Sequence, residues 1–242
     1  MFCLKTKPFF ELKYFSKRLL FSKSVIPLFW QTKIRLNKLQ PLSYQACISR
    51  SFHSLYSPLV TNMSSVDNPL VWIDCEMTGL EAGKDVLMEV AAIITDGNLK
   101  PVSESFDAVI HLSDQQLASM NEWCIAQHGK SGLTEKCRTS TLSVQEVERQ
   151  LLNYIKKYVS EKRVALIAGN SVHADVRFLA IEMPKVIEHL HYRIVDVSTI
   201  KELAKRWRPD IRPYEKKGDH RALSDIMESI HELEYFRSKW LH

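Results

Sequence analysis

Three apolar, β-rich runs follow one another closely and constrain the fold of this chain more than any other feature. They lie at residues 70–75, 86–95 and 105–111, and the third alternates apolar and polar residues as a half-exposed strand does. Asp96-Gly97 suits a turn between the second and third runs. Strands joined by such short connections predict an antiparallel meander.

The pattern then changes to alternating helices and strands. Apolar residues with the spacing of an amphipathic helix occupy 143–159, and a short buried strand follows at 164–168. The remaining predicted elements are a helix at 171–182, a strand at 192–197, a helix at 198–207 and a closing helix from about 221 to 236. We therefore expect an α/β domain with a mixed five-stranded sheet flanked by helices. No run of eighteen apolar residues is present, so we expect no membrane-spanning helix.

The first 66 residues differ in charge from the rest of the chain. They contain ten Lys or Arg and a single acidic residue, Glu11, whereas residues 67–242 contain 23 basic and 27 acidic residues. A basic, hydroxyl-rich segment almost without acids is typical of a mitochondrial transit peptide; a disordered basic tail or an RNA-binding arm is the alternative. We predict import to the matrix, with 67–242 as the folded domain. A second translation start at Met63 would give an untargeted cytoplasmic or nuclear form.

The mildly acidic balance of residues 67–242 restricts the partners that this domain can bind. A protein that binds long nucleic acid without sequence preference normally has a positive surface, because release of phosphate counterions supplies the affinity. If this domain acts on nucleic acid, we expect short substrates held by a few specific contacts.

Asp74 and Glu76 place two acids on one face of the first apolar run. Residues i and i+2 of a strand point to the same side, so both acids share a face with Trp72 while the alternate residues pack behind. Two like charges on an apolar strand repel each other and lose solvation, and a divalent cation removes both penalties. Carboxylate oxygens are the ligands that Mg²⁺ and Mn²⁺ prefer. Taken alone, however, the pair is better explained by solvent contact or a salt bridge.

Two further acids and a histidine stand at the ends of predicted core elements. Asp175 lies one turn into the helix that follows the strand at 164–168, with Ser171 as the predicted N-cap. Asp225 lies one turn into the closing helix, and His220 precedes that helix. Taken singly, Asp175 is explained as an acid that complements the helix dipole, and His220 as a structural histidine.

Together, the four acids support a more specific interpretation. Four carboxylates carry four negative charges, which two divalent cations would balance. Two such metals about 3.5–4 Å apart stabilise both the attacking and the leaving oxygen in phosphoryl displacement. His220 could deprotonate the attacking water near neutral pH. We therefore predict metal-assisted hydrolysis of a phosphodiester, with two Mg²⁺ or Mn²⁺ ions as cofactors.

Three segments resemble the motifs of the DEDDh group of exonucleases: WIDCEMTGLE at 72–81, AGNSVHAD at 168–175 and DHRALSD at 219–225. EWCIAQHGKSGL at 122–133 and HYRIVDVSTIKELAKRW at 191–207 make the chain similar to the oligoribonuclease family within that group. The resemblance spans about residues 68–240. It implies a ribonuclease H-like exonuclease fold, a homodimer, and 3′-to-5′ hydrolysis of very short RNAs, especially dinucleotides, to 5′-mononucleotides.

The same resemblance implies roles for individual residues. His220 would be the general base, and the two metals would be held by Asp74, Glu76, Asp175 and Asp225. Leu80 matches a leucine that wedges between the two bases of the substrate, and Trp123 matches an aromatic residue that stacks against one of them. A base–aromatic stack contributes about 1–3 kcal/mol and tolerates any base. Without the resemblance, Trp123 would be interpreted as a core residue.

Five further residues match positions that bind the substrate's 5′ phosphate. His128 and Ser171 match residues near that phosphate, while Tyr192, Arg193 and Ser198 match residues contributed by the other subunit. The guanidinium of Arg193 is suited to this role because it can bind a phosphate with two parallel hydrogen bonds. Without the resemblance, Tyr192 would be interpreted as a core residue.

One position departs from the family pattern, and two other functions stay open. Bacterial members can have Gln before the acid of the second motif, where this chain has Ala174, so no polar contact is expected from that side chain. The alternatives are a DEDDh nuclease acting on longer RNA or DNA, and a catalytically silent nucleic-acid-binding module. The acidic domain disfavours the first, and the presence of all four acids and His220 disfavours the second.

Overall fold

The computed structural model of this protein describes residues 66–215 and 221–241 of the 242-residue chain. Two predictions therefore fall on residues outside the described ones. These are the transit segment at 1–66, of which only Val66 is described, and the position of His220.

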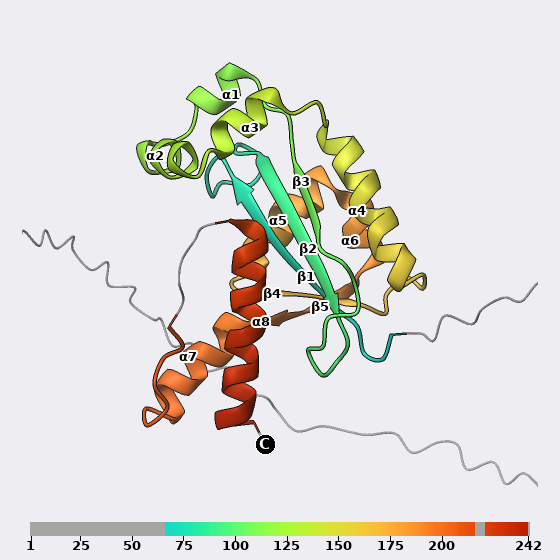
Figure 1. Cartoon of the computed structure of the whole chain (residues 1–242), viewed down its shortest axis with the longest axis vertical. Helices are drawn as coiled ribbons and strands as arrows, with labels where there is room; N and C mark the ends of the chain where they lie inside the picture. The colour runs from blue at the N-terminus through green and yellow to red at the C-terminus, as the bar shows by residue number, and fades with distance from the viewer. Residues whose placement is uncertain (1–65, 216–220, 242) are drawn as a thin grey trace, which may run out of the picture. The chain divides into compact units, whose positions relative to one another are not determined.

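Five strands form one mixed sheet with the order β3-β2-β1-β4-β5 (Figure 1). β1 (Leu70–Met77) pairs antiparallel with β2 (Leu87–Thr95), which pairs antiparallel with β3 (Phe106–Val109). On the other side of β1, β4 (Leu166–Gly169) and β5 (His191–Asp196) add in parallel. The predicted meander and the predicted mixed sheet are both confirmed.

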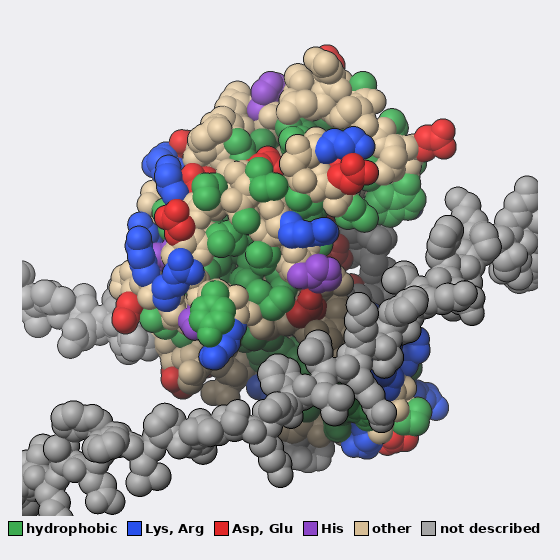
Figure 2. Space-filling model, turned by 180° about the vertical axis from the view of Figure 1, so that it is seen from behind, with side chains coloured by type: hydrophobic (Ala, Val, Ile, Leu, Met, Phe, Trp, Pro, Cys, Tyr) green, Lys and Arg blue, Asp and Glu red, His purple; other side chains and the backbone are tan. Residues whose placement is uncertain are grey.

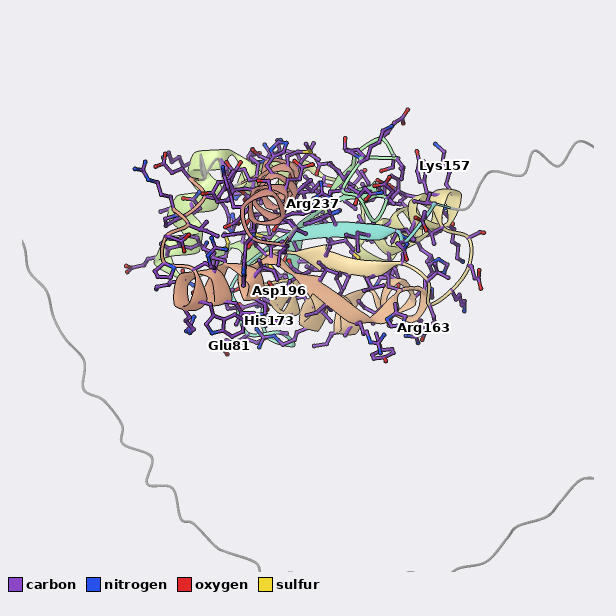
Figure 3. The ribbon with its side chains drawn as sticks, turned by 90° about the horizontal axis from the view of Figure 1, so that it is seen from below. Glu81, Lys157, Arg163, His173, Asp196 and Arg237 are labelled. Carbon is purple, nitrogen blue, oxygen red and sulfur yellow. The ribbon has the colours of Figure 1, made fainter. Side chains whose placement is uncertain are left out.

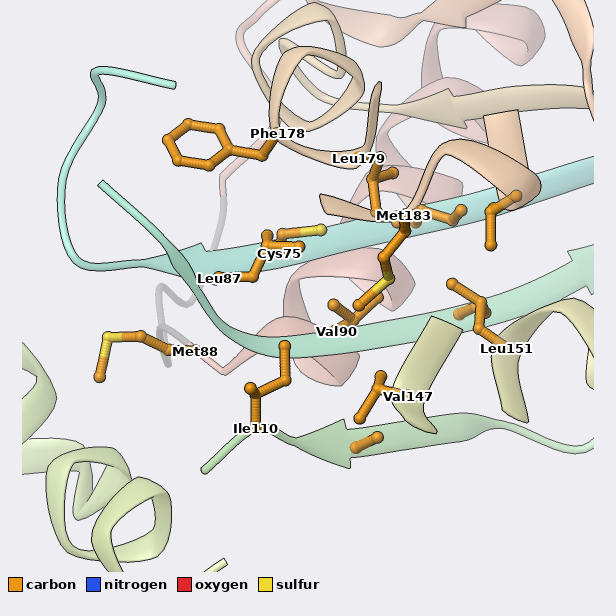
Figure 4. Close-up of a cluster of buried hydrophobic side chains, with 14 of the residues drawn as sticks. Cys75, Leu87, Met88, Val90, Ile110, Val147, Leu151, Phe178, Leu179 and Met183 are labelled. Atoms are coloured by element: carbon orange, nitrogen blue, oxygen red, sulfur yellow. The ribbon is translucent and has the colours of Figure 1, made fainter. Parts of the chain in front are cut away.

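One face of the sheet is covered by α4 (Val144–Tyr158), α5 (His173–Glu182) and α6 (Pro184–His189). The apolar residues of α4 recur with helical spacing, and their buried side chains join those of β1, β2 and α5 in the larger core cluster. Figure 4 shows this cluster, with Val147 and Leu151 of α4 on one side and Phe178 and Leu179 of α5 on the other. Cys75 of β1 points into it, as the alternation in β1 predicts.

The opposite face of the sheet carries α8 (Ala222–Lys239), which runs across β1 and β2 (Figure 1). Ala222, Ile226 and Ile230 pack against Trp72 of β1 in a second, smaller core cluster. α7 (Val197–Trp207) directly follows β5 and packs against α8. The face that Trp72 shares with Asp74 and Glu76 is thus the face that α8 covers. None of the described helices is long and apolar enough to cross a membrane.

Three helices between β3 and α4 were not predicted from the sequence pattern. They are α1 (Asp114–Ala118), α2 (Glu122–Ser131) and α3 (Leu133–Thr139). Local start signals are nevertheless present, because Ser113 forms a reciprocal capping box with Gln116, and the Asn121 side chain accepts the N–H of Cys124. These helices are short, so their apolar periodicity is weak and only their caps mark them.

Candidate active site

Three acids from two elements converge where β1 meets the start of α8. Asp74 and Glu76 lie in the second half of β1, and Asp225 lies in the first turn of α8. Each offers a carboxylate oxygen, and these oxygens all lie within 4.8 Å of one another. The packing of Ala222 and Ile226 on Trp72 fixes this approach, because it sets where the first turn of α8 lies on the sheet.

Asp175 joins the same strand from α5. Its side chain is 6% exposed, and its Oδ1 accepts the backbone N–H of Cys75 at 3.0 Å, between Asp74 and Glu76 in the sequence. Burial raises the pKa of Asp175 to about 7. The structure therefore brings Asp74, Glu76 and Asp225 into one cluster and attaches the fourth predicted ligand to the strand that carries two of them.

The electrostatics of this cluster favour a bound cation. Burial, followed by the neighbouring charges of Glu89, Asp225 and Asp175, raises the pKa of Glu76 to about 7. Carboxyl groups placed this close together must either hold protons or share a positive charge. Because all the donors are carboxylate oxygens, the cluster fits hard divalent cations such as Mg²⁺ or Mn²⁺.

Glu89, which is buried, and Arg221, which is partly exposed, form an ion pair beside the cluster that the sequence analysis did not single out. Glu89 lies on β2 opposite Glu76 and is 1% exposed. Arg221, the residue before α8, donates from Nη2 to Glu89 Oε1 at 2.9 Å. An acid inside the apolar run LMEVAAIIT is the same signal that identified Asp74, so pattern analysis could have found Glu89.

His128 of α2 is buried behind Glu76. Its Nε2 lies 3.0 Å from the backbone oxygen of Met77, and its Nδ1 lies 4.0 Å from Glu76 Oε2. Burial lowers the pKa of His128, so the ring is disposed to stay neutral. This position is next to the acidic cluster, and the expected contact of His128 with a 5′ phosphate stays a prediction.

Both residues predicted to contact the bases of the substrate are exposed. Trp123, at the start of α2, is 65% exposed, so the interpretation of this tryptophan as a core residue is wrong. Leu80 is also exposed, in the loop that joins β1 to β2. The Asp85 carboxylate accepts the N–H of Glu81 and fills the space beside Gly79 that any Cβ would need, which holds the loop in the shape that presents Leu80.

Ser171 and Ser198 lie side by side, and the prediction that Ser171 caps a helix is wrong. Helix α5 begins at His173 with Val172 as its N-cap, so Ser171 does not cap it; Ser171 instead has a left-handed backbone with φ of 51°. The Ser198 hydroxyl is 3.1 Å from the Ser171 hydroxyl of the same chain. Ser198 therefore accompanies Ser171 within one subunit, and its expected contribution to a second subunit stays a prediction.

Asp196 is the residue that holds these two serines together. It ends β5 and caps α7, and its Oδ1 accepts the N–H groups of both Ser171 and Ser198 at 2.9 Å. Its other oxygen lies 3.4 Å from Nδ1 of His173, and Figure 3 shows Asp196 and His173 close together at this end of the sheet. The parallel pairing of β4 with β5 places Gly169 opposite Asp196 and so creates this arrangement.

Tyr192 and Arg193 project from β5. Tyr192 is 73% exposed, which rules out its interpretation as a core residue. The guanidinium of Arg193 lies 5.3 Å from the centre of the Tyr192 ring. Ala174, the residue that departs from the family pattern, is half-buried beside Asp175.

Comparisons with known proteins agree on one family. The family model described as "Exonuclease" (RNase_T) matches residues 71–233. The chain is 76% identical over 179 residues to a probable oligoribonuclease of Schizosaccharomyces pombe, a match that covers 74% of this chain and 71% of that protein. It is 48% identical over 182 residues to a mitochondrial oligoribonuclease of Saccharomyces cerevisiae, covering 72% and 68%. An oligoribonuclease of Chromobacterium violaceum is 48% identical over 180 residues, covering 74% and 99%.

Solved structures show the same fold at low sequence identity. An E. coli ExoI–ssDNA complex matches with a TM-score of 0.59 and 13% identity, over 73% of this chain and 42% of that one. An exonuclease I of Methylocaldum szegediense matches with a TM-score of 0.57 and 15% identity, over 72% and 41%. The expected ribonuclease H-like exonuclease fold is confirmed.

Proposed function

This chain belongs to the exonuclease family and, within it, to the oligoribonucleases, so it is a 3′-to-5′ exoribonuclease. From this we propose that dinucleotides are its main substrates. The product of each cycle would be a 5′-mononucleotide. The observation that carries this proposal is the approach of Asp74, Glu76 and Asp225 within 4.8 Å of one another. The exposed Leu80 follows Glu76 by four residues, and the exposed Trp123 is on α2, whose His128 Nδ1 lies 4.0 Å from Glu76 Oε2.

The residues that would hold two divalent cations are Asp74, Glu76, Asp175 and Asp225. Their oxygen-only donor set suits a hard divalent cation. The raised pKa of Glu76 reflects its burial and neighbouring acids, whose repulsion a bound cation would relieve. Bound there, such cations supply an activated water and stabilise the charge that develops in phosphodiester displacement.

His220 is proposed to accept the proton of the attacking water. It immediately precedes Arg221 in the sequence, and the Arg221 side chain donates to Glu89 beside the acidic cluster. Replacing His220 by Ala should slow hydrolysis by about 10²–10⁴-fold, the usual contribution of a general base.

Contacts to the bases and contacts to the 5′ phosphate are together proposed to set the length of the substrate. Leu80 would separate the two bases, and Trp123 would stack on one of them. The 5′ phosphate would be bound by Ser171, Ser198, Arg193 and His128. Binding of that phosphate would leave no path for a longer 5′ strand. The excess of acidic over basic residues in 67–242 supports this, since a long strand would need a positive track.

The protein is proposed to act as a homodimer. Figure 2 shows a face on which hydrophobic side chains gather among Lys and Arg side chains. Exposed apolar residues on α5 and β5, namely Ile181, Tyr192 and Ile194, supply surface that a second copy could bury. In such a dimer Tyr192 and Arg193 would reach the partner's substrate.

The basic segment at 1–66 is proposed to direct the protein to the mitochondrial matrix, and a relative from S. cerevisiae is named as mitochondrial. A shorter form beginning at Met63 would stay in the cytoplasm or nucleus. Immunoblotting of fractionated cells tests both points: one band confined to mitochondria would exclude the shorter form, and absence from mitochondria would exclude import.

The deciding experiment compares Mg²⁺-dependent cleavage of a 5′-labelled diribonucleotide with cleavage of a labelled RNA of about twenty nucleotides. Asp74→Asn serves as the inactive control. Preference for the diribonucleotide is the expected result. Equal or faster cleavage of the longer RNA would favour a general exonuclease for longer RNA or DNA, and no cleavage of either would favour a binding module.

A further inference from the structure

Behind Ser171 and Ser198 a chain of hydrogen bonds leads into the buried side of α8. Asn170, which follows β4, donates from Nδ2 to Glu232 Oε2 at 2.9 Å and to Ser229 Oγ at 2.8 Å. Its Oδ1 accepts the hydroxyl of Ser198 at 3.0 Å. The three elements that meet here are the turn after β4, the start of α7 and the middle of α8.

The orientation of the Asn170 amide follows from its partners. Glu232 is fully buried and lies 3.6 Å from Lys201 Nζ, and its carboxylate can only accept hydrogen bonds. The NH₂ group of Asn170 must therefore face Glu232, which leaves the amide oxygen facing Ser198. The reverse orientation would set two oxygens against each other in a buried site, at the cost of an unmade hydrogen bond.

This orientation determines where the hydroxyl protons lie. Ser198 has one hydroxyl proton, and Asn170 Oδ1 can only accept, so the Ser198 proton is used in that bond. The oxygen of Ser198 then accepts the N–H of Ser171 at 2.9 Å. In the 3.1 Å contact between the two hydroxyls, Ser171 is consequently the donor.

We propose that Asn170, oriented by Glu232, is a positioning residue: it fixes the hydroxyl protons so that Ser171 donates a hydrogen bond to a 5′-terminal phosphate. In this arrangement the Ser198 oxygen accepts hydrogen bonds from Ser171 and does not donate to the phosphate. Ser171 is exposed, so its hydroxyl can rotate from Ser198 to a phosphate oxygen without uncovering a buried donor. Ser198 cannot donate to the phosphate while it donates to Asn170. The left-handed backbone of Ser171 is held by the hydrogen bonds from its N–H to Asp196 and Ser198.

This inference rests on the proposed function, because it assumes that substrates carry a 5′ phosphate at Ser171. It is tested by the ratio of kcat/KM for a 5′-phosphorylated diribonucleotide to kcat/KM for the same diribonucleotide with a 5′ hydroxyl. The variants are Asn170→Asp, which keeps the side-chain shape but removes both NH₂ donors, Asn170→Ala, and Ser171→Ala. Ser103→Ala is the matched control, since Ser103 also bonds a buried network, to Tyr154 OH at 2.6 Å, on a different part of the sheet.

We expect each of the three variants to lower the ratio by about tenfold, the loss of one hydrogen bond to a charged group. Ser103→Ala should leave the ratio unchanged. An Asn170→Asp protein that keeps the wild-type ratio would overturn the inference. If Asn170→Asp does not fold, an unchanged ratio in Ser171→Ala would overturn it equally. A wild-type protein with a ratio near one would instead reject the proposed phosphate site, whatever the variants do.

Discussion

Replacing Arg221 by Met should destabilise the protein strongly at neutral pH. The substitution leaves the Glu89 carboxylate, 1% exposed, without the guanidinium that donates to it at 2.9 Å. Among the described residues, its second oxygen has no hydrogen-bond partner. Removing one member of a buried ion pair costs about 3–5 kcal/mol. Glu76 lies opposite on β1 and adds a second negative charge.

We expect Arg221→Met to lower the free energy of unfolding by about 3 kcal/mol at pH 7, the lower end of that range, because the Arg221 side chain is one-third exposed. Urea unfolding of the metal-free protein at pH 7 measures this effect. The double variant Glu89→Leu with Arg221→Met should stay within about 1 kcal/mol of the wild type, because apolar residues often replace a buried pair without loss. Arg208→Met is the matched control, since it removes an ion pair of similar length, 2.8 Å to Asp210, that is exposed to solvent; it should cost less than about 1 kcal/mol. A cost below 1 kcal/mol for Arg221→Met at pH 7, or a double variant as unstable as the single one, would refute the reasoning.

Three further predictions concern the acidic cluster and the stacking residue. Asp74→Asn and Asp225→Asn should each reduce dinucleotide hydrolysis to background. Each should also raise the unfolding midpoint of the metal-free protein, because it removes a charge from a cluster of mutually repelling carboxylates. A folded variant with near-normal activity would refute the metal-ligand assignment. Burial raises the pKa of Glu76 and of Asp175 to about 7, so between about pH 4 and 7 the native protein binds more protons than the unfolded chain, and its metal-free stability should fall as the pH rises through that window. Mg²⁺ should therefore raise the unfolding midpoint more at pH 8 than at pH 5, and equal rises would contradict this. Trp123→Ala should raise the KM for the dinucleotide by about 5–150-fold, which corresponds to the loss of one base stack. The free energy of unfolding should change by less than about 0.5 kcal/mol, because the side chain is 65% exposed. An unchanged KM would exclude stacking.

Much of the fold was predictable because the signals that specify it are local. Alternation along β1 and β3 and the helical spacing in α4 each depend on residues within one element, and the structure confirms all three. The order of the elements then restricts the sheet to a meander followed by parallel additions. The short helices α1 to α3 escaped this approach, since a helix of one to three turns shows little periodicity.

For the candidate site, the sequence by itself determined which residue types were available and on which face of β1 they lie. Asp74 and Glu76 had to share the face of Trp72, because side chains in a strand alternate with a period of two. The positions of Asp175 and Asp225 at the starts of predicted core helices singled them out as companions, and the motif resemblance gave the same set. No local pattern, however, states how closely an acid in α8 approaches a strand about 150 residues earlier in the chain.

Only the tertiary structure decided the contacts that depend on packing between distant segments. It showed that Trp123 and Tyr192 are exposed, although tryptophan and tyrosine also occur in protein cores. It placed Ser171 in a left-handed conformation against Ser198, where the sequence had suggested a helix cap. It also paired Glu89 with Arg221 across 132 positions. Exposure, unusual backbone angles and long-range ion pairs are properties of the assembled layers, and short-range periodicity carries no information about them.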